Sequence, residues 1–358
     1  MRICGWWGRG GVGQVVPDTP NVRHSLTYTL RTRGTVPMAN TKTVVITGAF
    51  SYTGKYATRI LLGRQYRIRT LTYHPERANP FADRVQVFPY NFEHPERLTE
   101  TLRGASTLIN TYWVRFPHGK STFDAAVQNT VTLIAAAKNA GVRRIVHVSI
   151  ANPSLHSPLR YYKGKAQLER AVKESGLAYT ILRPTVIFGL EDILINNIAW
   201  FVRHFPVFAI PGDGCYRIRP IFVEDLARLL ADAPEQEGNA VRDAVGPETY
   251  TFEELVSQIA AQLQCRIHLV HVPMAAAYLA TRVAGWFVGD VVLTWEEYKG
   301  LMAALLAPEG PSTGETCLSQ WLAANREEIG RRYASELARH YARLPARESE
   351  NLNCANFQ

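Results

Sequence analysis

From residue 43 onward, two hydrophobic periods alternate along the chain. Short runs of β-branched and other apolar residues alternate with longer segments whose apolar side chains recur at i, i+3 and i+4. The short runs predict strands buried on both faces, and the longer segments predict amphipathic helices. Strands are expected at residues 43–46, 68–72, 85–88, 107–110, 145–149 and 179–182, and helices at residues 55–64, 123–140 and 161–175.

Strands that alternate with helices predict an α/β protein with a doubly wound parallel sheet and right-handed connections. The rhythm changes after about residue 190. The expected later elements are an irregular apolar loop (196–214), helices (223–233, 251–264, 294–306 and 318–341) and a strand (267–272). We therefore expect a sheet domain over residues 38–190, to which 218–233 return, and a smaller, mostly helical C-terminal cap over 191–345. Residues 346–358 are expected to form a flexible tail.

Residues 274–293 form the longest apolar stretch of the cap. Arg282 and Asp290 interrupt it, and Gly285 and Gly289 weaken it, so no transmembrane helix is expected. We expect a helix packed on the protein, with a lipid-facing role as the alternative.

Residues 1–37 are rich in Gly, Arg and Thr and show neither period, so we expect a disordered extension. The letters GRGGVG at residues 8–13 match a dinucleotide fingerprint, but no strand precedes them and no helix follows. An Arg-rich leader permits organelle targeting as the alternative to a cytoplasmic location.

The net charge of +9 is less informative than it looks, because residues 1–37 contribute +4 of it. The remainder is spread thinly and contains no basic run interleaved with aromatics. Nucleic-acid binding is not expected. The five cysteines lie far apart, without metal-ligand spacing, so we expect no metal site and a reducing compartment.

Candidate cofactor chemistry begins at the turn after the first strand. Gly48 permits a tight turn, and Gly54 lets the next helix approach so that its N-terminus faces a pyrophosphate. Ser51 stands where the fingerprint prefers its middle glycine. The turn predicts a nicotinamide dinucleotide site made by Thr47, Gly48, Phe50, Ser51, Tyr52, Thr53 and Gly54.

The tip of the second predicted strand bears on the choice of dinucleotide. NAD sites carry an acidic residue there, whereas this chain has His74 and Arg77, which could meet a 2′-phosphate. NADP(H) is therefore favoured over NAD(H).

Three residues suggest acid–base chemistry. Ser149 ends a predicted strand, and Tyr161 and Lys165 share one helix face at i, i+4 spacing. A nearby ammonium is expected to lower the pKa of Tyr161, which could then exchange a proton with a substrate oxygen held by Ser149. The alternative is a chance Tyr-x-x-x-Lys pattern in an ordinary helix.

Together these segments resemble the short-chain dehydrogenase/reductase superfamily, in its extended or atypical branch of NmrA-like and complex I accessory-subunit-like proteins. The resemblance covers about residues 43–272. It is carried by TGAFSYTG (47–54), NTV (129–131), GVRRIVHVS (141–149), YYKGK (161–165), ILRPTVIFG (181–189), RIRPIFVEDLA (217–227) and VGPETYTFEELVSQIA (245–260).

The resemblance implies a Rossmann fold and a role for each matching residue. Ser149, Tyr161 and Lys165 would be the catalytic set, with Asn129 completing a proton relay. Lys165 would also hold the nicotinamide ribose. The segment containing Pro184 and Thr185 would lie beside the nicotinamide, and Asn91 with Phe92 near the adenine.

We therefore expect an NAD(P)H-dependent oxidoreductase that acts on a small, apolar carbonyl-type substrate. One alternative is a non-catalytic dinucleotide-binding sensor or assembly subunit. Another is a sugar-nucleotide epimerase or dehydratase, which the apolar side chains of residues 200–208 disfavour.

Overall fold

The computed structural model describes residues 42–76 and 79–340. Three parts of the chain for which we stated expectations lie outside the described residues: residues 1–37, Arg77 and the tail at 346–358.

A seven-stranded sheet, parallel throughout, forms the centre of the described chain in the order β11-β6-β5-β4-β1-β2-β3. The order reverses between β1 and β4, and sheets of this kind bind their ligands at such a reversal, outside the carboxyl ends of the strands. The expected doubly wound parallel sheet is confirmed. Its strands are β1 (Thr43–Thr47), β2 (Arg67–Thr72), β3 (Val85–Pro89), β4 (Thr107–Asn110), β5 (Arg144–Val148), β6 (Ala178–Pro184) and β11 (Ala240–Ala244).

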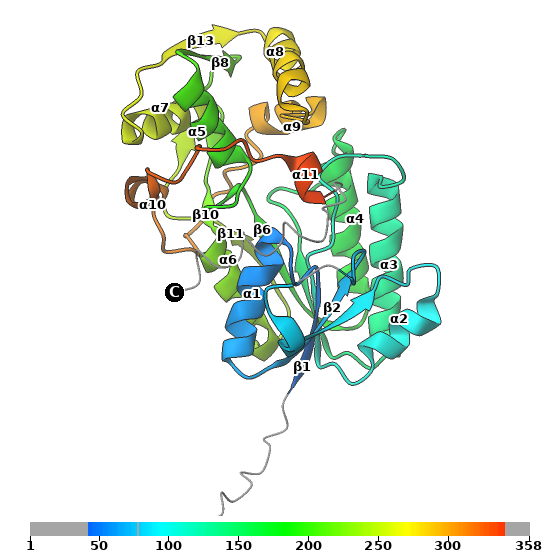
Figure 1. Ribbon diagram of the computed structural model, residues 1–358. Helices are drawn as coiled ribbons and strands as arrows, with labels where there is room; N and C mark the ends of the chain where they lie inside the picture. The colour runs from blue at the N-terminus through cyan, green and yellow to red at the C-terminus, as the bar shows by residue number, and fades with distance from the viewer. Residues whose placement is uncertain (1–41, 77–78, 341–358) are drawn as a thin grey trace, which may run out of the picture. The chain divides into compact units, whose positions relative to one another are not determined.

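Helices cover both faces of this sheet (Figure 1). Successive side chains of β1 alternate between the two layers: Val44 and Ile46 enter one buried cluster and Val45 enters the other. The first face is covered by α1 (Tyr52–Gly63) and α6 (Val223–Asp232), and the second by α2 (Pro95–Leu102), α3 (Phe123–Asn139) and α4 (Arg160–Glu174). Two single-turn helices span Ala82–Arg84 and Ala233–Glu235.

A helical C-terminal region follows, with its own core between α5 and α7. Three two-stranded pairs brace it: β7 with β10, β9 with β12, and β8 with β13. Its strands are β7 (Ile187–Phe188), β8 (Val207–Pro211), β9 (Arg217–Ile218), β10 (Ile221–Phe222), β12 (Tyr250–Thr251) and β13 (His268–Val272). Its helices are α5 (Leu194–His204), α7 (Phe252–Gln262), α8 (Met274–Val288), α9 (Trp295–Met302), α10 (Leu318–Asn325) and α11 (Glu336–His340).

The expectation of an irregular loop over residues 196–214 is wrong, because most of this segment belongs to α5 and β8. Ile195, Ile198 and Val202 recur at helical spacing and are buried in α5 against α7. Pro206 precedes β8 and Pro211 is its last residue, so neither interrupts a helix, and β8 pairs in parallel with β13.

The expectation of one continuous helix over residues 318–341 is also wrong. The chain forms α10 and the short α11, separated by Gly330 at a positive φ of 68°. A Cβ at position 330 would lie 2.5 Å from the carbonyl carbon of Ala199, so only glycine lets this segment cross α5 so closely. The helix expected over residues 294–306 is shorter, because it ends at Met302.

The apolar stretch 274–293 forms α8, which ends at Gly289 in the left-handed conformation. It does not pack on the protein as fully as expected, since only Ala277 and Gly285 are buried. Among the described residues, no helix is both long and apolar enough to cross a membrane.

Candidate cofactor site and active-site cavity

The glycine turn brings the N-terminus of α1 against the end of β1. Gly48 adopts a φ of +67°, and a Cβ at Gly54 would lie only 2.0 Å from the carbonyl oxygen of Gly48. Ser51 caps α1 by accepting a hydrogen bond from the Gly54 amide at 3.4 Å. The turn lies at the point where the sheet order reverses, which is where the N-terminus of a helix faces the pyrophosphate in dinucleotide-binding sheets.

Other residues expected in this turn have structural contacts. Thr47 accepts hydrogen bonds from the amides of Thr111 (2.7 Å) and Tyr112 (3.0 Å), which fixes the loop after β4. Phe50 packs against Phe81 with ring centroids 6.3 Å apart. Thr53 is half-buried in the first turn of α1.

Tyr52 is turned inwards. A Cβ at Gly189 would lie 2.6 Å from its hydroxyl oxygen, which is buried with no hydrogen-bond partner among the described residues. Burial raises the pKa of Tyr52. The phenol is therefore a neutral packing group behind the turn.

Beyond the ends of β2, β3 and β4 lies an aromatic cluster of Tyr73, Tyr90, Phe92 and Tyr112. Tyr90 and Phe92 stack with centroids 4.9 Å apart, and the hydroxyls of Tyr73 and Tyr112 lie 3.2 Å from each other. The cluster occupies the edge where Asn91 and Phe92 are expected near an adenine.

Asn129 of α3 belongs to this cluster. Its Nδ2 donates to the hydroxyl of Tyr112 at 3.0 Å and to that of Tyr73 at 3.4 Å. It makes no hydrogen bond to Tyr161 or Lys165, so the structure does not bring it into the expected proton relay. On the same side, the amide of His74 donates to Thr72 Oγ1 at 3.1 Å, and the carbonyl of Asn91 accepts from the amide of His94 at 3.0 Å.

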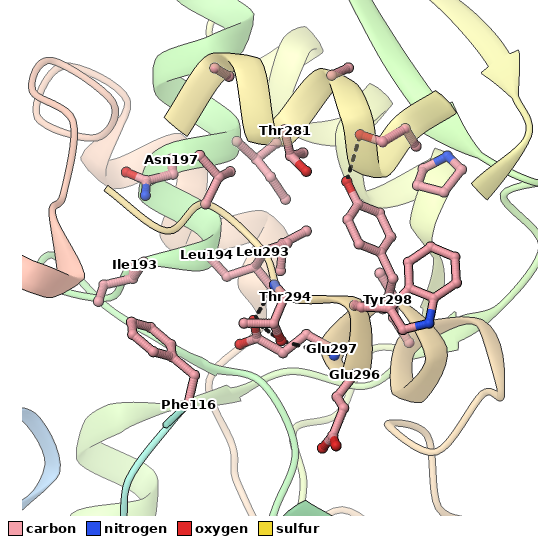
Figure 2. A pocket seen from close by; sticks show the side chains of 18 of the residues that line it. Phe116, Ile193, Leu194, Asn197, Thr281, Leu293, Thr294, Glu296, Glu297 and Tyr298 are labelled. Carbon is pink, nitrogen blue, oxygen red and sulfur yellow. Dashed lines mark hydrogen bonds between the residues drawn. The ribbon is translucent and has the colours of Figure 1, made fainter. Parts of the chain in front are cut away.

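A cavity of about 1310 Å³ lies between the carboxyl edge of the sheet and the C-terminal helices. Ile150 and Val186, which follow β5 and β6, line its floor with Tyr161. In Figure 2 the start of α5 (Ile193, Leu194), the loop residue Phe116 and the helices α8 and α9 surround the space. Its wall is overwhelmingly apolar.

Tyr161 is the member of the expected catalytic set that reaches this cavity. Its ring makes edge-on contacts with Trp113 and Phe123, at centroid distances of 5.5 and 5.8 Å. No described group makes a hydrogen bond with its hydroxyl. Tyr161 thus presents a positioned phenol to an apolar space.

An ion-pair group surrounds Tyr161. Arg115 Nε lies 2.5 Å from Glu297 Oε1, its Nη1 lies 3.5 Å from Glu336, and its Nη2 donates to the carbonyl of Val292 at 3.1 Å. The other oxygen of Glu297 caps α9 through Thr294 (Figure 2). Arg115 therefore joins the loop after β4 to α9 and α11 beside Tyr161.

Burial raises the pKa of Tyr161, and the charges of Glu297 and Glu336 raise it further, whereas Arg115 opposes them. The expected lowering of this pKa by Lys165 is wrong. The ammonium of Lys165 is directed elsewhere: it donates to the carbonyl of Val148 at 2.8 Å and lies 4.5 Å from the centroid of Trp113.

Lys165 itself is buried, and burial lowers its pKa to about 7. Trp113 reaches it because position 164 is glycine: a Cβ there would lie 2.9 Å from the indole. The indole therefore contacts both Tyr161 and Lys165.

Ser149 does not line the cavity. Its hydroxyl donates to Glu169 Oε1 at 2.7 Å, and Arg183 donates to both oxygens of the same carboxylate at 2.8 and 2.7 Å. Burial would raise the pKa of Glu169, but these hydrogen bonds hold it below its ordinary value. Glu169 is a buried carboxylate linking α4 to β5 and β6.

Pro184 and Thr185 lie where β6 leaves the sheet. The carbonyl of Pro184 accepts from the amide of Ala151 at 3.0 Å, and the hydroxyl of Thr185 donates to the carbonyl of Arg219. They tie β6 to the loop after β5 and to the C-terminal region.

Sequence reasoning missed Trp113, Arg115, Glu297 and Glu336. The ion pairs of Arg115 join residues 182 and 221 positions apart, so no local spacing reveals them. The available signal was the aromatic-rich stretch Tyr112-Trp113-Val114-Arg115-Phe116, which follows a strand at the reversal of the sheet order.

Comparisons with known proteins agree with this geometry. A family model described as NAD(P)H-binding matches residues 48–191. The chain is 26% identical over 264 residues to NADH dehydrogenase [ubiquinone] 1 alpha subcomplex subunit 9, mitochondrial, of Arabidopsis thaliana, covering 68% of this chain and 66% of the relative. It is 22% identical over 247 residues to photosystem II assembly factor Ycf39 of Cyanidium caldarium, covering 68% and 78%. Among solved structures, triphenylmethane reductase of Citrobacter complexed with NADP(H) has a TM-score of 0.63 at 19% identity, covering 80% and 95%.

The sheet order, the glycine turn and these matches define a dinucleotide-binding α/β protein. Over residues 48–191 the chain matches the NAD(P)H-binding family, and it resembles the atypical NAD(P)H-binding branch of the short-chain dehydrogenase/reductase superfamily. It spans 50–66% of the length of the first NADH dehydrogenase subunits that it matches.

Proposed function

We propose that the protein is an NAD(P)H-dependent reductase of apolar carbonyl compounds, with Tyr161 as the proton donor. The observation that carries this proposal is the placement of the Tyr161 phenol on the floor of the apolar cavity, at the carboxyl edge of a dinucleotide-binding sheet.

The residues of the glycine turn would hold the cofactor. Gly48, Ser51, Thr53 and Gly54 would bind the pyrophosphate, and the aromatic cluster offers surfaces for the adenosine, with His74 and Arg77 favouring NADP(H). Lys165, as in the superfamily that the chain resembles, would hold the nicotinamide ribose. When bound there, the cofactor would supply the hydride for the carbonyl carbon and would itself be oxidised to NAD(P)⁺.

Tyr161 supplies the other half of the reduction. Its phenol donates a hydrogen bond to the carbonyl oxygen and then transfers its proton, so that the product is an alcohol. The phenolate then recovers a proton from water, which its surroundings favour, because burial and the charges of Glu297 and Glu336 outweigh that of Arg115. Since burial keeps Tyr161 protonated, the phenol is ready to donate at neutral pH.

A second candidate is a dinucleotide-binding protein that acts in assembly without turnover. It is favoured by the engagement of Ser149 with Glu169 and of Lys165 with Val148, which leaves Tyr161 alone in the cavity. The names of the NADH dehydrogenase subunits and of the assembly factor agree with it, and their mitochondrial or photosynthetic context favours an organelle over the cytoplasm.

A sugar-nucleotide epimerase is disfavoured by the cavity. Polar side chains away from Tyr161 already have protein partners: Asn197 bonds to the backbone of Ala334, and Thr281 to the carbonyl of Tyr278. Few donors remain for a sugar or a diphosphate.

The test is net oxidation of NADPH with a panel of ketones and aldehydes, in the unmodified protein and in Tyr161→Phe. We expect turnover in the first and a loss of roughly 10²-fold or more in the second, with the NADPH dissociation constant unchanged. No oxidation with any member of the panel would favour the assembly candidate.

A further inference from the structure

Seven of the twelve exposed large apolar side chains in the described residues gather in one region. Four lie on α8 at positions 279, 283, 286 and 287, which is helical spacing along one stripe. The others are Phe205, Val207 and Val270, at the end of α5 and on the adjoining β8–β13 pair (Figure 1). A contiguous surface of this kind marks a site of contact with a protein or a lipid.

This surface is continuous with the cavity. Leu279, Val283 and Phe287 are 65%, 50% and 75% exposed, yet they also line the cavity, so they form its mouth. Trp286, at 79% exposed, stands just outside it. The side chains that are both exposed and part of the cavity lining on α8 are thus large and apolar.

The cavity has one polar end. Arg115, Glu296, Glu297 and Glu336 cluster at Tyr161, and Glu296 accepts a hydrogen bond from the Tyr161 amide at 3.4 Å. The opposite wall, on α8 and α5, is apolar except for Asn197 and Thr281, whose side chains already bond to backbone carbonyls. At about 1310 Å³, the space also exceeds the roughly 300–1,000 Å³ of ordinary small-molecule sites.

We propose that the cavity binds a carbonyl compound with a long hydrocarbon chain, taken from a lipid surface against which the exposed face of α8 rests. The carbonyl end reaches Tyr161, and the chain extends along α5 and α8 towards the mouth. This inference rests on the proposed reductase function for the role of the carbonyl, but not for the binding of the chain.

The side chains on the exposed face of α8 favour a lipid surface as its binding partner. Leu279, Val283, Trp286 and Phe287 face outwards, and Arg282 lies among them at i+3 from Leu279 and i−4 from Trp286. Such a face offers apolar side chains to the acyl chains of a lipid layer, while the long stem of Arg282 can bring its charge to the headgroups. Arg282 is the only charged residue of α8 and is exposed, so the one charge that the helix presents suits anionic headgroups.

The first experiment measures binding without turnover. Unbranched methyl ketones from hexanone to hexadecanone are titrated into the full chain, and quenching of tryptophan fluorescence is followed, since Trp200 and Trp295 line the cavity. We expect the affinity to rise by about fourfold per added methylene until the cavity is filled. An affinity that does not change with chain length would overturn the proposal.

Two variants of α8 locate the site. Ala284 lines the cavity, so Ala284→Phe should weaken the longest ketones at least tenfold while leaving the shortest unaffected, which also shows that the variant is folded. Ala275 is exposed on the same helix outside the cavity, so Ala275→Asp is the control for Val283→Asp at the mouth. If Val283→Asp and Ala275→Asp lowered the affinity for the ketones equally, the cavity would not have its mouth at Val283.

The second experiment uses vesicles of phosphatidylcholine and phosphatidylglycerol in a sedimentation assay. The unmodified chain should sediment with them, and Trp286→Gln should reduce sedimentation while leaving ketone affinity unchanged, because Trp286 lies outside the cavity. Absence of vesicle binding would overturn the lipid surface as the source.

The outcomes separate this inference from the reductase function. Chain-length-dependent binding without NADPH oxidation would retain the lipid site and reject the reductase. Oxidation of NADPH by short ketones, with an affinity independent of chain length, would retain the reductase function and reject the lipid site.

Discussion

The hydroxyl of Ser149 donates a 2.7 Å hydrogen bond to Oε1 of Glu169, and both side chains are buried. A serine held in this way cannot also hold a substrate oxygen unless the bond to a charged acceptor is broken. In this protein the bond instead fastens the end of β5 to α4, the helix that carries Tyr161.

Ser149→Ala should therefore lower stability more than catalysis. Loss of a hydrogen bond to a charged acceptor costs about 2 kcal/mol, whereas turnover should fall by less than tenfold because Tyr161 keeps its place. Urea unfolding and NADPH oxidation measure the two effects. Ser106→Ala is the matched control, since Ser106 donates at 3.0 Å to a neutral carbonyl, that of Thr43. A collapse of turnover with unchanged stability would return Ser149 to the catalytic set.

Replacement of Lys165 should change how stability depends on pH. The pKa of Lys165 is about 7 in the folded chain against 10.5 ordinarily, so between these values the unfolded chain binds a proton that the folded chain lacks. The free energy of unfolding of the unmodified protein should hence rise by about 4 kcal/mol between pH 7 and pH 10.5 because of this group. The same contribution is lost as the pH falls from 10.5 to 7.

Lys165→Met should remove that rise, so the difference in unfolding free energy between the two proteins should shrink or change sign from pH 7 to pH 10.5. Lys163→Met, exposed on the same helix, is the control and should leave the profile unchanged. Parallel profiles for Lys165→Met and the unmodified chain would show that Lys165 is not buried as described.

The glycine turn offers a paired test within one helix. Gly54→Ala should separate α1 from β1, because its Cβ would lie 2.0 Å from the carbonyl oxygen of Gly48. We expect a loss of several kcal/mol in stability and of measurable NADPH binding. Gly63→Ala, in the last turn of α1 with nothing within 4 Å of the new Cβ, should be neutral or stabilise by up to about 1 kcal/mol. Calorimetry with NADPH would contradict us if Gly54→Ala still bound it normally.

NADPH is expected to bind more tightly than NADH, because no carboxylate stands at the end of β2 and His74 and Arg77 follow it. Arg77→Ala should reduce the preference by roughly tenfold or more, the effect of one charge-assisted contact to phosphate, and leave NADH affinity unchanged. Arg84→Ala, an exposed arginine in the same connection, controls for net charge. Equal dissociation constants for the two cofactors in the unmodified chain would remove the basis of this assignment.

The sheet domain could be predicted from sequence because its signals are local. Each parallel strand is a short apolar run, and each covering helix shows the helical spacing of its apolar residues within a few turns. The C-terminal region was harder: the prolines at 206 and 211 obscured the apolar period of α5, and the break at Gly330 depends on its contact with Ala199.

The candidate site divides in the same way. The glycine turn and Tyr161 are recognisable from spacing, whereas the charges that govern Tyr161 come from Glu297 and Glu336, far along the chain. Nor does any spacing reveal that Ser149 faces Glu169 or that Lys165 faces Trp113, because side-chain direction is decided by packing that only the fold brings together.

Gly164 gives the indole of Trp113 room to contact both Tyr161 and Lys165. The two groups therefore share one aromatic neighbour, while the ammonium bonds to the carbonyl of Val148 and not to the phenol. Burial and the carboxylates of Glu297 and Glu336 raise the pKa of the phenol, whereas burial lowers the pKa of the ammonium. Acidity and cofactor attachment, joined in one short helical motif, are thereby free to be tuned separately by mutation.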